Sequence, residues 1–277
     1  MIKALLPLLT EQLSRASGAN AENELYWLMM HCLDTSRVSI MTNQSIDRQE
    51  DAWDNLACIF KRYHEGVPIA YLIGHTPFLD LDIYVSEGVL IPRADTEAMV
   101  LALIKQMKQN DAVLELGVGS GAIACTLAKH CPSITVLGVD KSPQAVAQSI
   151  KNAKHVNVVE QVTFLQGDWN EISHFGTFNL VVSNPPYIDN QDTEVSPQVR
   201  EFEPHDALFS DNQGLADLKR IIEIAKHNLV EGGILALEHG YLQQTWVANM
   251  LKEQGFDQVV LGKSYNKPRY ILAKRGL

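Results

Sequence analysis

The chain has 277 residues, 46% of them apolar, enough to bury the core of one large α/β domain or of a domain of about 200 residues with a small companion. Against 33 acidic residues there are 23 basic ones, and the formal net charge of −10 opposes non-specific binding to nucleic acid, so bulk nucleic acid is a poor candidate substrate. The four cysteines form no Cys-x-x-Cys pair, the histidines show no metal-ligand spacing and no apolar stretch reaches about 18 residues, so we expect no metal, no membrane span and a reducing cytoplasm.

Residues 1–74 carry apolar side chains at steps of three and four, which predicts a small bundle of about three helices. We therefore place an N-terminal helical domain at residues 1–74. The three apolar sets are Leu5, Leu8, Leu9 and Leu13; Leu25, Leu28, Met29 and Leu33; and Trp53, Leu56, Ile59, Phe60 and Tyr63.

Residues 75–92 have the pattern of a β-hairpin that joins the bundle to the rest of the chain. Thr76–Val85 alternates apolar with polar residues from Phe78 onward, and Glu87-Gly88 then precedes the apolar Val89–Ile91. We expect the two strands of the hairpin in these two stretches, followed by a helix over residues 96–108.

From residue 112 onward strand and helix patterns alternate, which indicates βαβ units and a parallel sheet with right-handed crossovers. We assign residues 93–277 to one α/β domain on this basis. The expected strands are 112–116, 134–140, 162–166, 178–183, 233–238, 256–261 and 270–273, and the expected helices are 122–130, 143–153, 214–230 and 243–253.

The apolar run Phe178–Ser183 ends in the loop Asn184-Pro185-Pro186-Tyr187. Proline fixes φ and restricts the residue before it, so Asn184 and Pro185 are both held extended. The side-chain carbonyl of Asn184 and the main-chain carbonyl of Pro185 can then accept both hydrogens of an NH2 group, beside the flat ring of Tyr187. The loop predicts a pocket for a planar NH2 substrate, although a stiff turn after a strand would have the same residues.

A glycine-rich loop, Glu115–Gly121, lies between the first strand of the sheet and a helix, where main-chain N–H groups can approach a ligand. Its Gly-x-Gly-x-Gly spacing also passes as a dinucleotide motif because Ala122 follows it. Asp140 closes the second strand 19 residues after Gly121, where a carboxylate can take both hydroxyls of a ribose. A nucleotide-type ligand without a 2′-phosphate follows from this pair of features.

Asp168 and Trp169 come directly after the third strand of the sheet. The carboxylate of Asp168 can accept from an adenine amino group, and the indole of Trp169 can stack on a ring. A capping aspartate beside a packed tryptophan would explain the same two residues. Together with Asp140, they favour an adenosine ligand.

Five segments together resemble the class I S-adenosylmethionine-dependent methyltransferases, and within them the protein-glutamine N5-methyltransferases that modify peptide chain release factors. The resemblance spans essentially the whole chain. It implies a Rossmann-like sheet that is mostly parallel, with one antiparallel strand near its edge. The segments are Leu90–Glu97, Glu115–Gly121, Asp140, Gly167–Trp169 and Asn184–Ile188.

The resemblance also implies roles for single residues. The glycine loop would bind the methionine part of S-adenosylmethionine, Asp140 its ribose and Trp169 its adenine. Asn184, Pro185 and Tyr187 would be catalytic, and these three with Pro186 would bind the substrate. The implied cofactor site is Glu115, Gly117, Val118, Gly119, Ser120, Gly121, Asp140, Asp168, Trp169 and Asn184.

The resemblance implies that the protein partner is a class I release factor, whose Gly-Gly-Gln loop presents the target glutamine and which the N-terminal domain helps to bind. We expect a monomer with no direct nucleic-acid substrate. Positioning rather than a strong base would drive transfer, because Asn184 and Pro185 can orient an amide nitrogen whose lone pair is otherwise delocalised. Arg93, Glu97, Glu203 and Glu238 stay outside this predicted site.

Three alternatives share part of the pattern. Ribosomal-protein glutamine methyltransferases and N6-adenine DNA methyltransferases have similar Asn-Pro-Pro-Tyr loops. The acidic charge and the lack of a basic recognition region oppose the DNA enzyme, whereas only the resemblance of Asp95-Thr96-Glu97 opposes the ribosomal-protein enzyme. An NAD-linked dehydrogenase would use the glycine loop and Asp140 but leaves the Asn184 loop unexplained.

Overall fold

The computed structural model describes residues 21–42, 50–170 and 176–276. The helix expected around Leu5–Leu13 lies outside these residues. The helices are α2 (Ala21–Cys32), α3 (Arg37–Thr42), α4 (Glu50–His64), α5 (Ile69–Ile73), α6 (Ala94–Ile104), α7 (Ala122–His130), α8 (Pro143–His155), α9 (Pro197–Phe202), α10 (His205–Leu208), α11 (Asp211–Gly214), α12 (Ala216–Asn228) and α13 (Gln244–Glu253). The strands are β1 (His75–Phe78), β2 (Leu81–Tyr84), β3 (Ala112–Leu116), β4 (Thr135–Asp140), β5 (Val162–Gln166), β6 (Phe178–Ser183), β7 (Ile188–Asp189), β8 (Phe209–Ser210), β9 (Leu229–Glu238), β10 (Phe256–Ser264) and β11 (Lys267–Arg275).

The chain divides into two compact units, and the smaller one is helical. It consists of Met1–His75 together with Pro197–Phe202, and the larger one of Thr76–Ser196 and Glu203–Leu277. The apolar side chains that α2 and α4 share at helical spacing are buried in the smaller unit, among them Leu25, Leu28 and Leu56. Helix α9 joins the same unit, where Gln198 Nε2 donates to the carbonyl of Gly66 at 2.8 Å.

A β-hairpin follows the bundle, but its second strand is not the one expected. β1 and β2 form a two-stranded sheet on their own, whereas residues 89–91 form no strand, so the expectation of a strand there was wrong. The chain reverses earlier because Leu79 adopts a φ of 53°, and its N–H donates to Glu97 Oε1 at 2.9 Å. The alternating pattern from Phe78 to Val85 therefore contains a turn as well as a strand.

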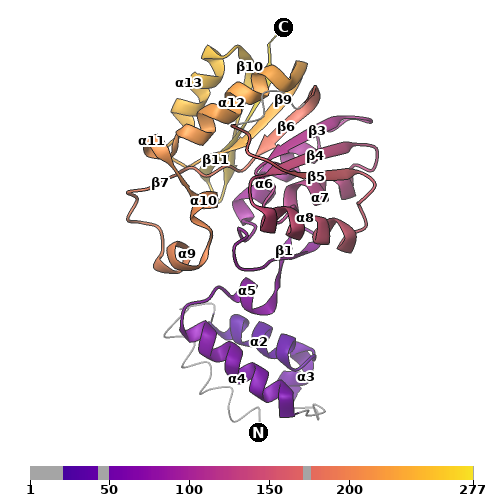
Figure 1. Cartoon of the computed structure of the whole chain (residues 1–277), viewed down its shortest axis with the longest axis vertical. Helices are drawn as coiled ribbons and strands as arrows, with labels where there is room; N and C mark the ends of the chain where they lie inside the picture. The colour runs from indigo at the N-terminus through magenta and orange to yellow at the C-terminus, as the bar shows by residue number, and fades with distance from the viewer. Residues whose placement is uncertain (1–20, 43–49, 171–175, 277) are drawn as a thin grey trace. The chain divides into compact units, whose positions relative to one another are not determined.

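The larger unit is built on a seven-stranded sheet of order β10-β11-β9-β6-β3-β4-β5 (Figure 1). The strands β9, β6, β3, β4 and β5 are parallel neighbours, and β11 pairs antiparallel with both β9 and β10. This confirms the predicted Rossmann-like sheet, mostly parallel with one antiparallel strand near its edge.

The helices cover both faces of this sheet. Strand order runs from β3 through β4 to β5 in one direction and from β3 through β6 to β9 in the other, so right-handed crossovers put α7 and α8 on one face and α12 on the opposite one. Buried side chains of α12 and α13, including Leu218, Ile222 and Leu251, pack with the sheet residues Leu114 and Val181 in one apolar core.

The strand register brings the carboxyl ends of four strands to one level. Leu116 of β3 is paired with Val139 of β4 and with Ser183 of β6, and Ser183 is paired with Leu237 of β9. The residues that close or follow these strands, including Asn184 and Glu238, therefore meet at one edge of the sheet, where open α/β sheets bind ligands.

The described helices include none with enough length and apolar content to pass through a bilayer.

One buried asparagine links the hairpin to the glycine loop. Asn152 Oδ1 accepts from the N–H of Tyr84 at 2.9 Å, while Nδ2 donates to the carbonyls of Tyr84 and Ser120, each at 2.8 Å. The side chain is fully buried on α8. A buried amide that satisfies three main-chain groups fixes two loops with a single residue.

We predict that Asn152→Ala lowers the free energy of unfolding by about 2–4 kcal/mol, because main-chain groups of Tyr84 and Ser120 lose their partner. Urea unfolding followed by circular dichroism measures the change. Lys154→Ala is the matched control, since Lys154 lies exposed on the same helix and its replacement is expected to change stability by less than about 0.5 kcal/mol. Equal stability of the two variants would contradict this role of Asn152.

Candidate active site

A cavity of about 530 Å³ lies at the carboxyl edge of the sheet, within the larger unit. Six of the predicted site residues line it, and other lining residues come from the segment after β2, the start of α8 and the region of α10. The predicted six are Gly117, Gly119, Asp140, Trp169, Asn184 and Pro186.

The remaining predicted residues lie around this cavity. Glu115, Val118 and Ser120 line a neighbouring space of about 40 Å³ that Asn184 also borders. Asp168 borders a side pocket of about 90 Å³ together with Trp169 and Pro186. Of the other three, Gly121 directly precedes α7, Pro185 is buried, and the hydroxyl of Tyr187 donates to Glu238.

The glycine loop turns sharply beneath the cavity. Gly117, Gly119 and Gly121 have φ values of 77°, 54° and 81°, which favour glycine. A Cβ on Gly117 would lie 3.2 Å from the ring of Trp169, whereas one on Gly119 would meet nothing within 4 Å. The loop therefore packs against Trp169 at one point and leaves open space at another.

Asp140 binds the loop as well as lining the cavity. Its Oδ2 accepts from the N–H of Gly119 at 2.8 Å and its Oδ1 from the N–H of Ser142 at 2.9 Å. Burial raises the pKa of Asp140, and these two N–H groups oppose that shift. Since each carboxylate oxygen can accept two hydrogen bonds, the side chain keeps capacity for a ligand donor.

Trp169 and Asp168 differ in what they contact. The indole Nε1 of Trp169 is buried and has no hydrogen-bond partner among the described residues. Asp168 Oδ1 instead accepts from the N–H of Asn170 at 2.8 Å, so its carboxylate forms a local turn. The structure places Trp169 on the main cavity and Asp168 beside it.

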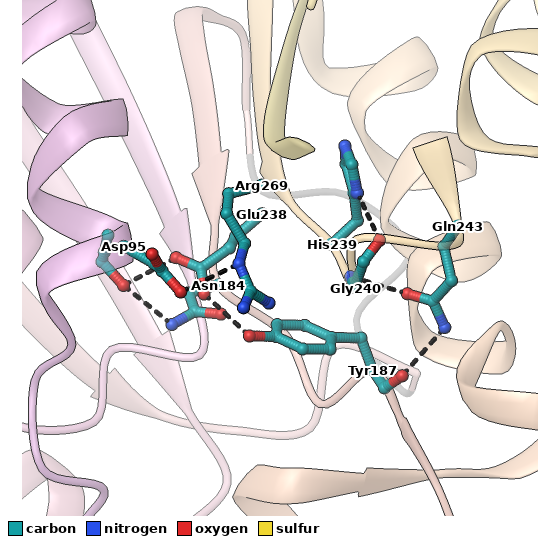
Figure 2. Close-up of polar contacts among 9 residues, drawn as sticks. Asp95, Asn184, Tyr187, Glu238, His239, Gly240, Gln243 and Arg269 are labelled. Atoms are coloured by element: carbon teal, nitrogen blue, oxygen red, sulfur yellow. Dashed lines mark hydrogen bonds and ion pairs between the residues drawn. The ribbon is translucent and has the colours of Figure 1, made fainter. Parts of the chain in front are cut away.

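Asn184 belongs to a partly buried hydrogen-bond network at the ends of β6 and β9 (Figure 2). Its Nδ2 donates to Thr96 Oγ1 at 3.1 Å, and Thr96 Oγ1 donates to Glu238 Oε2 at 2.6 Å. The hydroxyl of Tyr187 donates to the other oxygen, Glu238 Oε1, at 3.0 Å. Thr96, Asn184, Tyr187 and Glu238 together form this Asn184 network.

Glu238 is the charged centre of the network. Its side chain is fully buried, and loss of water raises its pKa to about 7, although the hydroxyls of Thr96 and Tyr187 oppose the shift. Burial, followed by the nearby Glu238 carboxylate, raises the pKa of Tyr187, so the phenol keeps its proton. An ion pair between Arg269 Nε and Asp95 Oδ2, 2.9 Å long, lies beside them (Figure 2).

The main chain of Tyr187 is fixed from the other side. Gln243 Nε2 donates to the carbonyl of Tyr187 at 2.9 Å, and Gln243 Oε1 accepts from the N–H of Gly240 at 2.8 Å (Figure 2). Gly214 approaches the same carbonyl so closely that a Cβ there would lie 2.1 Å from the oxygen. This close approach requires glycine and makes the Asn184 loop rigid at its far end.

Arg93, Glu97, Glu203 and Glu238, which the sequence analysis did not include in the predicted site, all have polar partners in the larger unit. Arg93 Nη2 and Glu203 Oε1 form an ion pair of 2.5 Å, and Glu203 is buried. Glu97 accepts from Leu79 in the hairpin. The fourth, Glu238, is bonded directly to Tyr187.

Neither Thr96 nor Glu238 was among the predicted site residues. Glu238 ends a strand that neighbours β6 in the sheet, so the rule that parallel strands converge at their carboxyl ends contained a signal for it. Thr96 lies in the first turn of α6, and neither strand pattern nor periodicity relates it to Asn184.

Comparison with known sequences gives several release factor glutamine methyltransferases. The chain is 42% identical to the one from Salmonella typhimurium over 211 residues, 76% of each protein. It is 35% identical over 266 residues to the one from Aliivibrio fischeri, covering 95% of this chain and 93% of that protein. The profile of the methyltransferase small domain matches residues 92–202, and that of the PrmC N-terminal domain matches residues 4–74.

Comparison with solved structures supports the fold alone, because sequence identities are low. A methyltransferase from Pyrococcus furiosus superposes with a TM-score of 0.53 at 17% identity, covering 72% of this chain and 91% of that one. A tRNA m1G37 methyltransferase from M. jannaschii has a TM-score of 0.51 at 14% identity, covering 73% of this chain and 56% of the other.

Burial of Glu115 makes its contribution to the stability of the protein depend on pH. It is fully buried, its Oε2 accepts from the N–H of Ala124 at 3.0 Å, and burial raises its pKa well above the ordinary 4.5. Because the raised pKa belongs to the folded state, the stability contribution of Glu115 is complete below pH 4.5 and is lost as the pH rises.

We predict that Glu115→Gln, which keeps an acceptor for Ala124, gains stability relative to the parent protein between pH 5 and pH 8. The gain is about 1.4 kcal/mol per pH unit until the carboxyl ionises in the folded protein. Urea unfolding at both pH values measures it, with the exposed Glu160→Gln as control for the charge change. A stability difference independent of pH would contradict the prediction.

Proposed function

This chain belongs to the family of release factor glutamine methyltransferases, and we propose that it methylates the side-chain amide nitrogen, N5, of the glutamine in the Gly-Gly-Gln motif of class I release factors. Membership confirms the resemblance predicted from the sequence, and with it an S-adenosylmethionine-dependent methyltransferase. The observation that carries the proposal is the position of Asn184, which directly follows β6 and lines the 530 Å³ cavity together with Gly117 and Gly119 of the glycine loop.

The residues of the cavity fit S-adenosylmethionine. The open space at Gly119 allows close approach of a ligand to the main chain, and Trp169 adds an aromatic ring to the lining of the same cavity. Asp140 keeps acceptor capacity for ribose hydroxyls while it fixes the loop. In this proposal Glu115, Gly117, Val118, Ser120 and Gly121 shape and bind the methionine part.

The bound cofactor supplies a methyl group on a positively charged sulfur that is a good leaving group. The protein's own contribution is to orient the substrate nitrogen. Asn184 Oδ1 accepts no hydrogen bond from another described residue, since the only bond of this side chain is the one that Nδ2 donates to Thr96. It is therefore available to accept one N–H of the glutamine.

The carbonyl of Pro185 provides the second acceptor in this proposal. Two acceptors fixed by proline-restricted backbone can orient the NH2 group and favour a pyramidal nitrogen, which lessens the delocalisation of its lone pair. The ring of Tyr187 and Pro186 would flank the planar amide. No strong base is required, because the nitrogen becomes far more acidic once it is methylated.

We propose that the substrate is a protein and not a nucleic acid. A net charge of −10 opposes binding to a phosphate backbone. We propose that the N-terminal helical domain, residues 1–74, helps to bind the release factor, that a hairpin within 75–92 links it to a catalytic domain from residue 93 onward, and that the protein acts as a cytoplasmic monomer.

The test is incubation of the protein with labelled S-adenosylmethionine and, in separate reactions, an intact class I release factor, ribosomal proteins and adenine-containing DNA. We expect label in the release factor, and mass spectrometry should place it on the glutamine of the Gly-Gly-Gln motif. Label in a ribosomal protein or in DNA, with none in the release factor, would refute the proposed function.

The same assay tests the role of Asn184. Asn184→Ala should reduce methyl transfer by at least about 100-fold, since one of the two acceptors that orient the nitrogen is lost. Its affinity for S-adenosylmethionine, measured by calorimetry, should stay within about threefold of the parent protein because the loop and Asp140 are unchanged. Near-normal turnover in this variant would overturn the assignment.

Asp140 should act mainly on cofactor affinity. Asp140→Ala is expected to weaken S-adenosylmethionine binding by about 1–3 kcal/mol, through lost ribose contacts and a released Gly119. Asp140→Asn, which keeps one acceptor, should lose less. Calorimetry measures both, with Asp257→Ala at an exposed position as the charge-matched control; unchanged affinity in Asp140→Ala would contradict the ribose assignment.

A further inference from the structure

The Asn184 network joins residues from three separate parts of the chain. Thr96 is in the first turn of α6, Glu238 is the last residue of β9, and Asn184 with Tyr187 follows β6. The relative solvent exposure is 4% for Thr96 and 0% for Glu238. The polar groups of Thr96 and Glu238 must therefore be satisfied within the protein, whereas Asn184 and Tyr187 are partly exposed.

The donors and acceptors of the network can be assigned one by one. An ionised carboxylate only accepts, so Glu238 takes the hydroxyl protons of both Thr96 and Tyr187. A threonine hydroxyl has a single proton, and Thr96 has already donated it. Towards Asn184 it can then only accept, which selects the NH2 end of the carboxamide as its partner.

We propose that Thr96 and Glu238 are positioning residues that orient the Asn184 carboxamide, with Nδ2 held by Thr96 and Oδ1 turned towards the glutamine amide. The inference rests on the proposed function and deepens it. Thr96 and Asn184 border the same small space beside the main cavity, so the bond between them lies next to the reacting group. Neither positioning residue needs to touch the substrate.

Protonation of Glu238 would reverse the directions of the hydrogen bonds from Glu238 through Thr96 to Asn184. The protonated carboxyl can donate to Thr96 Oγ1, which frees the threonine proton to bond Asn184 Oδ1 instead. The carboxamide would then rotate, and its NH2 group would face the NH2 group of the substrate. Two donors would oppose each other where an acceptor is needed.

The groups around Glu238 determine the pH at which its carboxylate is protonated. Asp95 on α6 favours the protonated form, whereas Arg269 on β11 and the hydroxyls of Thr96 and Tyr187 favour the ionised one. His239, the next residue, is buried with a lowered pKa and donates from Nδ1 to the carbonyl of Gly240 at 2.8 Å. With burial as the largest cause, the pKa of Glu238 lies at about 7.

Burial of the Glu238 carboxylate costs desolvation free energy that an apolar side chain in the same place would not. A buried carboxylate without a directly bonded cation loses its hydration, and apolar residues of similar volume commonly replace such groups without loss of stability. The hydroxyls of Thr96 and Tyr187 compensate part of that loss. A carboxylate in this place is therefore better explained by the orientation that it imposes than by stability.

Substitutions at Thr96 test the inference in the methylation assay. Thr96→Val removes the hydroxyl at nearly constant shape and should lower kcat by about 10- to 100-fold, with affinity for S-adenosylmethionine within about threefold. Thr96→Ser keeps the hydroxyl and should stay within about threefold of the parent kcat. Thr126→Val is the matched control, since Thr126 is a fully buried threonine whose hydroxyl donates locally to Ala122.

The pH profile separates orientation from general packing. In the parent protein kcat should fall as the pH drops through about 7, because Glu238 is then protonated. Glu238→Gln cannot titrate and should lack this acid limb, whatever its kcat. Tyr187→Phe removes a donor that stabilises the carboxylate and should move the limb to higher pH. An acid limb that persists unchanged in Glu238→Gln, or normal kcat in Thr96→Val, would overturn the inference.

A readout without catalysis distinguishes this inference from the proposed function. The side-chain NH2 signals of Asn184 in a ¹⁵N–¹H spectrum, identified by their absence in Asn184→Asp, should shift with a midpoint near pH 7 in the parent protein. The shift should be absent in Glu238→Gln. If the signals titrate in this way but no release factor is methylated, the proposed function fails and the orientation stands. If methylation is normal and the signals do not titrate, the orientation fails.

Discussion

The parallel register of β3, β6 and β9 is the constraint on which the site depends. Pairing of Leu116 with Ser183, and of Ser183 with Leu237, brings three strand ends to one level. A shift of one residue in any of these pairs would turn alternate side chains to the opposite face of the sheet. The glycine loop, the Asn184 loop and Glu238 could then no longer meet.

Two fully buried carboxylates give this edge of the sheet an unusual electrostatic character. Burial raises the pKa of both Glu115, beside the glycine loop, and Glu238, beside the Asn184 loop. Glu115 accepts from the N–H of Ala124 in α7, and Glu238 accepts from the hydroxyls of Thr96 in α6 and Tyr187 in the Asn184 loop. Perturbed carboxyls of this kind concentrate at functional sites, where geometry is maintained at the expense of stability.

The sequence predicted elements and loops well where the signal is local. Glycine spacing, the prolines and the alternation of strands with helices follow from short-range backbone preferences, and they predicted the sheet and the loops that border the cavity. The turn at Leu79 was missed because a leucine at positive φ has no sequence signature. The return of α9 to the smaller unit was missed because its bonds, such as Gln198 to Gly66, join residues 132 positions apart.

Asn184 shows the difference between what the local sequence predicts and what depends on the tertiary structure. The sequence alone placed Asn184 and Pro185 directly after a buried strand and predicted an extended backbone for both, because proline restricts the backbone locally. Which end of the Asn184 carboxamide bonds to Thr96 follows only from the tertiary structure. That choice depends on Thr96, 88 residues before Asn184, and on Glu238, which lies 142 residues after Thr96 and accepts its hydroxyl proton. Hydrogen-bond partners so distant in sequence come together only when the sheet and α6 have folded.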